Sequence, residues 1–206
     1  LILEPLTEAL TQCGFEIESL GSDPEAIEEL SLFMRKEAGF ENVGMPFLMR
    51  LESAAYGGET DEVFSLSKPL DFTYPLKHVS DYKGLSQNKE PLRLGLDTIR
   101  ILSSKAKDTP VIADVCGPVS LAASLLDGKT LLKSMAKDPA GTHGLLEFLA
   151  KNTVAYAAAL KKNGADAVFI SDNFSTALTL GKPFFREYAL CYLNVLCNAI
   201  REAGCL

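Results

Sequence analysis

The chain has 206 residues, a formal net charge of −7, 47% hydrophobic and 23% charged residues. These values are typical of a soluble globular domain that is long enough to bury a core. The acidic balance disfavours nucleic-acid binding, because no basic patch is available to displace counterions from phosphates. The apolar runs are too short to cross a bilayer, so we expect no membrane-spanning segment.

Cysteine usage indicates a reducing compartment. The chain contains five cysteines, an odd number without paired spacing, namely Cys13, Cys116, Cys191, Cys197 and Cys205. This pattern favours a cytoplasmic protein over a disulfide scaffold. Cys191 and Cys197 lie six residues apart on a predicted helix and point to different faces, so they cannot jointly hold a metal.

The first predicted helix begins after Asp23 and ends at Ala38. Asp23 precedes Pro24, and this pair is typical of a helix start because the carboxylate caps free N–H groups while proline fits the first turn. Gly39 can adopt the left-handed conformation that closes a helix. An extended segment is predicted to begin at about Val43.

A helix-then-strand pattern recurs in the second half of the chain. The predicted elements are a helix from about Pro91 to Lys107, a strand at Val111–Cys116 before the turn Gly117-Pro118, a helix from Asp138-Pro139 to Asn163-Gly164, a strand at Ala167–Ser171, and a long helix from about Pro183. Helix-then-strand units in series predict a parallel sheet, because each helix returns the chain across it. Both strands are continuous apolar runs, as expected of strands buried on both faces.

We therefore expect an α/β fold that forms one domain over residues 1–206. Glycines and prolines between residues 57 and 90 predict a loop or hairpin excursion. The end of the chain at Gly204 repeats the helix–glycine–apolar step where a further strand is expected. No phosphate-binding Gly-x-Gly-x-x-Gly motif is present, which weakens nucleotide-binding open-sheet folds. These observations alone do not separate an open sheet from a closed barrel.

Several segments occur in an order that carries a family resemblance. They are Ser22-Asp23-Pro24-Glu25, Leu51-Glu52-Ser53-Ala54-Ala55-Tyr56-Gly57, Tyr74-Pro75-Leu76-Lys77, Gly117-Pro118-Val119-Ser120, Leu126-Asp127-Gly128, Gly164-Ala165-Asp166-Ala167-Val168 and Pro183-Phe184-Phe185-Arg186-Glu187. This ordered set resembles the uroporphyrinogen decarboxylase-like superfamily, and most of all its corrinoid-dependent methylcobamide:coenzyme M methyltransferase branch. The resemblance implies the N-terminal half of a (β/α)8 TIM-like barrel with parallel strands, truncated in this chain.

The resemblance also implies cofactors and partners. Methyltransferases of this branch use zinc, held by a His-x-Cys pair and a later cysteine, to activate a thiol that accepts a methyl group from a methylcobamide. A corrinoid protein and a small thiol such as coenzyme M are the implied partners. This chain has no His-x-Cys pair, because neither His78 nor His143 has a cysteine two residues on, so we expect no metal ligands in it. Both histidines are expected to have structural roles at the surface or near helix ends.

Candidate site residues lie in or directly after the predicted strands, at the mouth of such a barrel. Glu52 is a candidate because the resemblance implies an acidic residue near this mouth. Asp172 and Glu52 are the candidate catalytic residues, and Asp114, Cys116 and Asn173 are candidates for substrate binding. Each has a structural alternative. Asp172 could be a cap or turn residue, Glu52 could lie on the exposed side of a short helix, Asp114 could bond backbone groups, and Cys116 could be a small buried apolar residue.

The leading functional hypothesis is a methyltransferase, or part of one, that moves a methyl group from a methyl-corrinoid to a zinc-activated thiol. The first alternative is a non-catalytic half-barrel that binds a partner, because a half-barrel exposes unpaired strand edges and is expected to self-associate as a homo-oligomer. A uroporphyrinogen decarboxylase is disfavoured, because its substrate carries many carboxylates and needs cations to bind them. The resemblance implies an Arg-rich loop near the first strand for this purpose, and this segment of the chain offers only Arg50.

Overall fold

A parallel three-stranded sheet lies at the centre of the fold. The computed structural model describes residues 10–16, 19–44, 50–60 and 72–205. The strands β1 (Val43–Gly44), β4 (Val111–Cys116) and β5 (Ala167–Ser171) pair in the order β1-β4-β5, and both pairings are parallel. The predicted α/β class with parallel strands is confirmed, and β4 and β5 have the predicted bounds.

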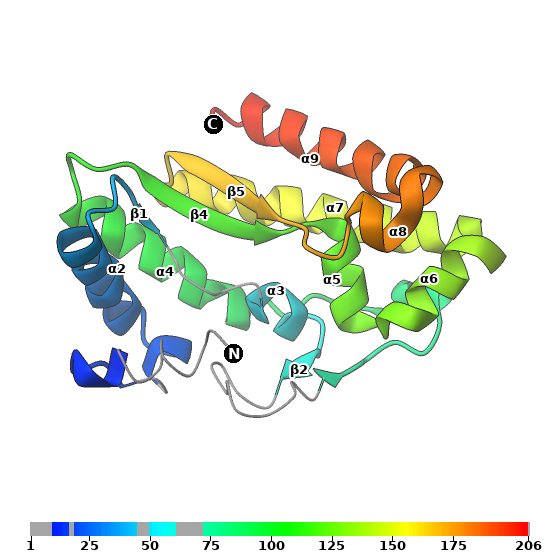
Figure 1. Ribbon diagram of the computed structural model, residues 1–206, viewed down its shortest axis with the longest axis horizontal. Coiled ribbons are helices and arrows are strands. Elements are labelled where there is room, and N and C mark those ends of the chain that lie inside the picture. The colour runs from blue at the N-terminus through cyan, green and yellow to red at the C-terminus, as the bar shows by residue number, and fades with distance from the viewer. Residues whose placement is uncertain (1–9, 17–18, 45–49, 61–71, 206) are drawn as a thin grey trace.

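One face of the sheet is covered by the helices α4 (Glu90–Lys105), α7 (Pro139–Lys162) and α9 (Cys191–Glu202). Figure 1 shows α4 and α7 behind the sheet and α9 along its β5 side. The buried side chains of this layer form one core cluster. Its members include Val111, Ala113 and Val115 from β4, Ile99 and Leu102 from α4, Ala157 and Leu160 from α7, and Leu196 and Ile200 from α9.

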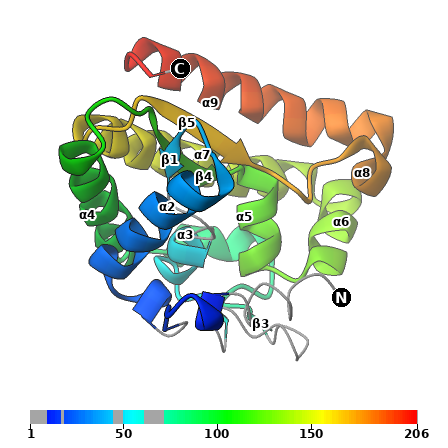
Figure 2. The same ribbon diagram turned by 60° about the vertical axis from the view of Figure 1, so that its left-hand side comes forward.

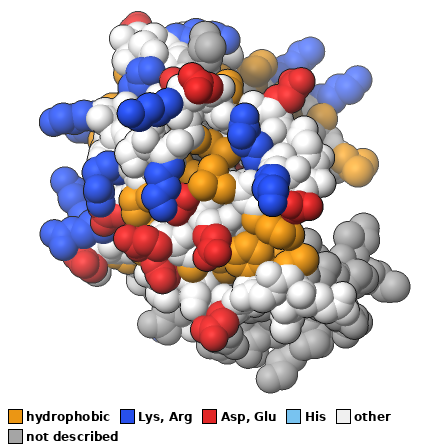
Figure 3. Space-filling model, turned by 90° about the vertical axis from the view of Figure 1, so that its left-hand side faces the viewer, with side chains coloured by type: hydrophobic (Ala, Val, Ile, Leu, Met, Phe, Trp, Pro, Cys, Tyr) orange, Lys and Arg blue, Asp and Glu red, His pale blue; other side chains and the backbone are white. Residues whose placement is uncertain are grey.

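The opposite face of the sheet is more open. Successive residues of a strand point to opposite faces, so Asp114 and its ladder partner Phe169 share the face turned away from this core. Phe169 is 61% exposed. Phe40, Ile112 and Asp114 join it in lining a hollow of about 300 Å³. Hydrophobic side chains also gather between charged groups on the face of the molecule drawn in Figure 3. In a closed barrel this face of the sheet would be the interior.

The helix α2 (Pro24–Ala38) has the predicted bounds and packs beside β1, as Figures 1 and 2 show. The Asp23 carboxylate accepts the Glu25 N–H at 2.9 Å, and Gly39 ends the helix with a φ of 73°. A turn of 3-10 helix, η1 (Ser19–Gly21), precedes it. Cap chemistry therefore fixes both ends of this element.

The segment between residues 57 and 90 contains an antiparallel pair and a 3-10 helix, which confirms the predicted hairpin excursion. The strands β2 (Glu59–Thr60) and β3 (Phe72–Thr73) pair antiparallel, and η2 (Val79–Gly84) follows. The short helix α3 (Arg50–Ala54) comes before this excursion. It carries the candidate residue Glu52.

The crossover from β4 to β5 consists of α5 (Pro118–Leu125), α6 (Gly128–Lys137) and α7. Buried leucines of these helices form a second core cluster with side chains of the segment after β5. The predicted helix from Asp138-Pro139 to Asn163-Gly164 is confirmed as α7.

The helix predicted from about Pro183 begins earlier and is irregular. Its first part is α8 (Ala177–Phe184), capped by Thr176, whose hydroxyl accepts the Thr179 N–H at 3.0 Å. Gly181 interrupts α8 with a φ of 73° and a ψ of 155°, which are not helical values. The helical turn from Ala177 to Leu180 is therefore separate from the helix that follows, and the sequence did not predict it. The chain then passes through a π-helix, η3 (Phe185–Leu190), into α9. In the described residues, no helix is both long and apolar enough to span a membrane.

Candidate functional site

The carboxyl ends of β4 and β5 lie side by side, because Cys116 pairs with Ser171 in the parallel ladder. Polar side chains from three elements meet there. Glu52 comes from α3, Asp114 from β4, and Asp172 directly follows β5. In barrels of parallel strands, this end of the strands is where active sites form.

Glu52 is buried and anchored on both sides. One carboxylate oxygen accepts the backbone N–H of Cys116, and the other accepts the Thr153 hydroxyl of α7 at 3.0 Å. The residue is only 3% exposed, so the alternative of an exposed position on a short helix is wrong. Glu52 is a buried hydrogen-bond acceptor that joins α3, β4 and α7.

Burial controls the protonation of Glu52. Loss of solvent raises the pKa of its carboxyl from 4.5 to about 7, and nearby Asp114 adds to the rise. The two hydrogen bonds from Cys116 and Thr153 act in the opposite direction, because they favour the charged form. Glu52 can therefore take up or release a proton near neutral pH.

Asp114 points from the middle of β4 to the open face of the sheet. Its Oδ2 accepts the Ser171 hydroxyl at 3.1 Å, while its Oδ1 is buried without a hydrogen-bond partner. Burial raises the pKa of Asp114 to about 6. A carboxyl group with one unpartnered oxygen and a pKa in this range can donate to or accept from a bound polar group.

Asp172 closes the turn after β5 against the start of α5. Its Oδ1 accepts the Ser120 N–H at 2.7 Å, and the Ser120 hydroxyl in turn accepts the Phe174 N–H at 2.9 Å. The carboxylate thus caps a helix N-terminus that lies far from it in sequence. Its Oδ2 is buried without a partner, and burial raises the pKa of the group. The capping alternative therefore describes one oxygen, while the other is buried without a partner among the described residues.

Position 117 requires glycine because the Asp172 side chain packs directly against its Cα. A Cβ built on Gly117 would lie 2.2 Å from the Asp172 Cβ. The Gly117 N–H donates to the Ser171 carbonyl at 2.7 Å, which extends the β4–β5 pairing by one bond. The Gly-Pro turn seen in the sequence is thus the position where the β5 turn packs against β4.

Asn173 and Cys116 have different surroundings. Asn173 is exposed, and its side chain forms no hydrogen bond with the described residues, so it is free to contact a ligand. Cys116 is 3% exposed and belongs to an apolar cluster. Burial, Glu52, Asp172 and Asp114 all raise the pKa of its thiol, which keeps it protonated. Its backbone N–H, rather than its thiol, contributes to the site.

The described residues do not fit a resident zinc ion. They contain no group of three or more His, Cys, Asp or Glu side chains placed to share a metal. Both carboxylate oxygens of Glu52 accept bonds from the protein, and Cys116 is held as a thiol, whereas zinc binds the thiolate. No step of the chemistry is therefore assigned to zinc.

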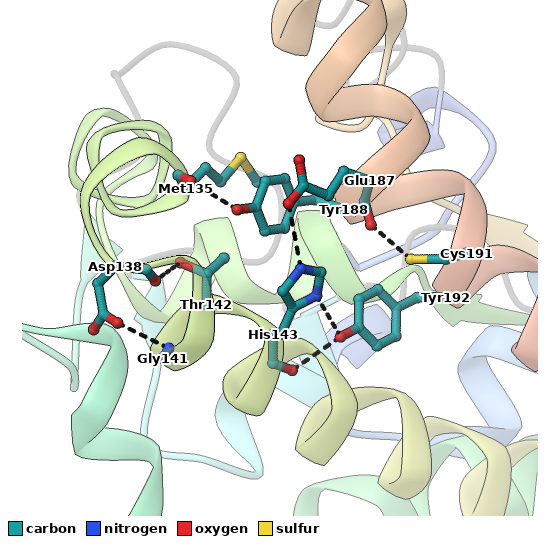
Figure 4. Close-up of polar contacts among 9 residues, drawn as sticks. All are labelled: Met135, Asp138, Gly141, Thr142, His143, Glu187, Tyr188, Cys191 and Tyr192. Carbon is teal, nitrogen blue, oxygen red and sulfur yellow. Dashed lines mark hydrogen bonds and ion pairs between the residues drawn. The ribbon is translucent and has the colours of Figure 1, made fainter.

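A second polar cluster surrounds His143 at the start of α7 (Figure 4). The His143 Nδ1 lies 2.9 Å from the Tyr192 hydroxyl, and that hydroxyl also donates to the His143 carbonyl at 3.0 Å. The imidazole stacks on Tyr188 at a centroid distance of 4.7 Å, and its Nε2 lies 3.6 Å from a Glu187 oxygen. These contacts join α7 to the π-helix and α9, which agrees with the structural role expected for His143 near a helix end.

Tyr188 hydrogen-bonds a backbone carbonyl at the end of α6. Its buried hydroxyl donates to the Met135 carbonyl of α6 at 2.7 Å. The residue four positions after Met135 is Pro139, which has no N–H, so the helix itself cannot satisfy that carbonyl. The π-helix thus supplies the donor that the junction between α6 and α7 lacks.

Sequence reasoning missed the partners of the site carboxylates. Thr153, Ser171 and Ser120 hold Glu52, Asp114 and Asp172 respectively. Thr153 lies on the apolar face of α7, where a buried hydroxyl needs a partner, and this was the one available signal. Which carboxylate each hydroxyl or N–H meets depends on tertiary packing.

Comparison with known proteins places the chain in a family. Residues 5–205 match the family model described as Uroporphyrinogen decarboxylase (URO-D), and the chain belongs to this family. It is 30% identical over 185 residues to the methylcobamide:CoM methyltransferase MtbA of Methanosarcina acetivorans, covering 88% of this chain and 54% of that protein. It is 29% identical over 140 residues to the uroporphyrinogen decarboxylase of Edwardsiella ictaluri, covering 64% of this chain and 39% of that protein.

A solved structure supports the fold. A methyltransferase from Methanosarcina mazei superimposes with a TM-score of 0.82 at 22% sequence identity, over 94% of this chain and 58% of that chain. The expected resemblance and the partial TIM-like barrel are thereby confirmed. The chain spans about half the length of the curated methyltransferases it matches.

Proposed function

We propose that this protein transfers a methyl group from a methylated corrinoid protein to a small thiol such as coenzyme M. The observation that carries the proposal is the 30% identity to a methylcobamide:CoM methyltransferase over 88% of the chain. Acidic side chains at the strand ends, where a barrel of this kind binds its substrate, also support it.

The proposed chemistry requires a proton acceptor. As the sulfur–carbon bond forms, the cobalt–carbon bond breaks with its electron pair left on cobalt, and the thiol proton must pass to a base. Asp172 and Asp114 each keep one carboxylate oxygen without a partner among the described residues, and both have raised pKa values. We assign them, with the exposed Asn173, to substrate contact and proton transfer.

Glu52 has a supporting place in this proposal. Both of its oxygens accept hydrogen bonds from the protein, so it fixes the end of β4 beside Asp114. Its pKa of about 7 also allows it to hold a proton close to the site. We therefore propose that Glu52 is a positioning residue that holds the end of β4, and that the charge of Asp114 raises its proton affinity.

Incubation of the purified protein with methylcobalamin and coenzyme M tests the proposal. Loss of the methylcobalamin absorbance together with loss of free thiol is the expected result. Asp172→Asn should lower the rate at least about tenfold, as removal of an acid–base group does. Asp138→Asn is the matched control, because Asp138 is another capping aspartate but caps α7 at an exposed position.

Two outcomes would overturn the proposal. Release of CO₂ from uroporphyrinogen, without thiol methylation, would show a decarboxylase, for which the matches to that enzyme are the supporting observation. A folded protein that methylates no thiol and instead forms a stable oligomer would support the non-catalytic half-barrel.

A further inference from the structure

The short helix α3 presents a second pair of polar side chains on the side away from Glu52. Arg50 and Ser53 are three residues apart, so they are neighbours on the helix surface. Both line a hollow of about 390 Å³ between the start of α2, α3 and the start of α4. Gly21, Ser22 and Glu90 contribute to its other walls. A hollow of this size can hold a small molecule.

Two hydrogen-bonding atoms of this pair have no partner among the described residues. Ser53 is 4% exposed, and its Oγ forms no hydrogen bond. The Arg50 Nε is buried and also lacks a partner, while the Nη2 of the same guanidinium donates to the Gly21 carbonyl at 2.9 Å. Buried polar atoms in folded proteins nearly always have partners, so two unpartnered atoms on residues that line one hollow point to a ligand there.

The charge of Arg50 also has no counter-ion among the described residues. A guanidinium stays charged in proteins, and none of the ion pairs among the described residues includes Arg50. Glu90, the acidic residue of the same hollow, is paired with Arg93 at 2.9 Å and is exposed. Burial lowers the pKa of Arg50, which is the effect of a cation removed from water without a counter-ion.

We propose that this hollow binds a small oxoanion through the Arg50 guanidinium and the Ser53 hydroxyl. Carboxylate, phosphate and sulfonate groups share the chemistry required, which is two or more acceptor oxygens that match the planar donor fork of arginine. The site lies on the opposite side of α3 from Glu52, so it is separate from the strand-end site. The inference does not depend on the proposed methyl transfer.

Calorimetric titration of the protein with acetate, inorganic phosphate and methanesulfonate tests this site, with sodium chloride at matched ionic strength as the reference. Saturable binding of at least one of the three, below about 10 mM, is expected, and the preferred probe identifies the class of anion. Saturable binding of none of them, or a response equal to that of chloride, would overturn the proposal.

Variants locate the binding. Arg50→Gln should raise the Kd at least about tenfold, and Ser53→Ala by roughly threefold, because each removes a donor. Arg100→Gln is the matched control, since it removes the same charge from an exposed position on α4 whose ion-pair partner, Asp97, does not line the hollow, and it should bind like the original protein. Arg50→Lys keeps the charge but loses the fork, so it should fold and bind more weakly. Unchanged affinity in folded Arg50→Lys and Ser53→Ala proteins would contradict the proposal.

Discussion

Glu52 caps the buried carboxyl end of β4 by accepting the backbone N–H of Cys116, the last residue of that strand, across 64 positions of sequence. A side chain from α3 thus takes the place that a carbonyl of a neighbouring strand would otherwise occupy. Because the same carboxylate also accepts the Thr153 hydroxyl, one buried acid joins three elements at the candidate site.

The first prediction concerns the pH dependence of stability. The pKa of Glu52 rises from 4.5 to about 7 on folding, so the folded state favours the protonated acid. The stabilisation is complete below pH 4.5 and is lost as the pH rises to about 7, by about 3 kcal/mol in total. Glu52→Gln should remove this loss, as measured by urea unfolding at pH 5 and pH 8.

Asp114 provides the comparison for this experiment. Its pKa is raised in the same direction, to about 6, so some loss of stability with rising pH should persist in Glu52→Gln. The double variant with Asp114→Asn should show the smallest pH dependence. The same stability difference between pH 5 and pH 8 in Glu52→Gln and the original protein would show that Glu52 does not titrate in this range.

The second prediction distinguishes the capping role of Asp172 from its proposed role in methyl transfer. Asp172→Ala removes the acceptor of the Ser120 N–H and should lower the free energy of unfolding by about 1 kcal/mol, the usual cost of a lost helix cap. Asp172→Asn keeps an acceptor oxygen and should lose less stability, although the proposed methyl transfer should fall. Equal stability losses in both variants, measured by denaturant unfolding, would contradict the capping role.

The third prediction concerns the close approach at Gly117. Gly117→Ala places a Cβ 2.2 Å from the Asp172 Cβ, so the β5 turn must move away from β4. We expect a loss of about 1–3 kcal/mol in the free energy of unfolding, as for overpacking in a core. Gly84→Ala is the matched control, because a Cβ there meets nothing within 4 Å. Thermal unfolding of the two variants measures this, and Gly117→Ala should have the lower midpoint. Similar midpoints would exclude a steric conflict at Gly117.

The fourth prediction concerns the π-helix. Tyr188→Phe leaves the Met135 carbonyl without a donor in a buried position and should cost about 1–3 kcal/mol. Tyr192→Phe removes the contacts with His143, but these are only partly buried, so water can replace them and the cost should be below about 1 kcal/mol. If chemical denaturation ranked the two variants in the reverse order, the carbonyl of Met135 would have to be satisfied in another way.

The local sequence predicted most of the regular elements. Asp23 before Pro24 and Gly39 after Ala38 fixed the bounds of α2, because capping groups act within one turn of the residues they serve. The apolar runs of β4 and β5 were equally local signals. The turn before Gly181 was missed, because its cap at Thr176 lies in a polar stretch without a helical apolar pattern.

The partnerships at the site were decided by tertiary structure alone. The sequence placed Asp172 at a strand end and Asp114 inside a strand, and the family resemblance placed Glu52 near the mouth of the barrel. It could not show that Glu52 would be buried against Cys116, or that Asp172 would cap α5, since those bonds join residues more than 50 positions apart. Side-chain type and spacing determine what an element is, whereas packing of the elements determines which polar atoms lose water and which partner each one meets.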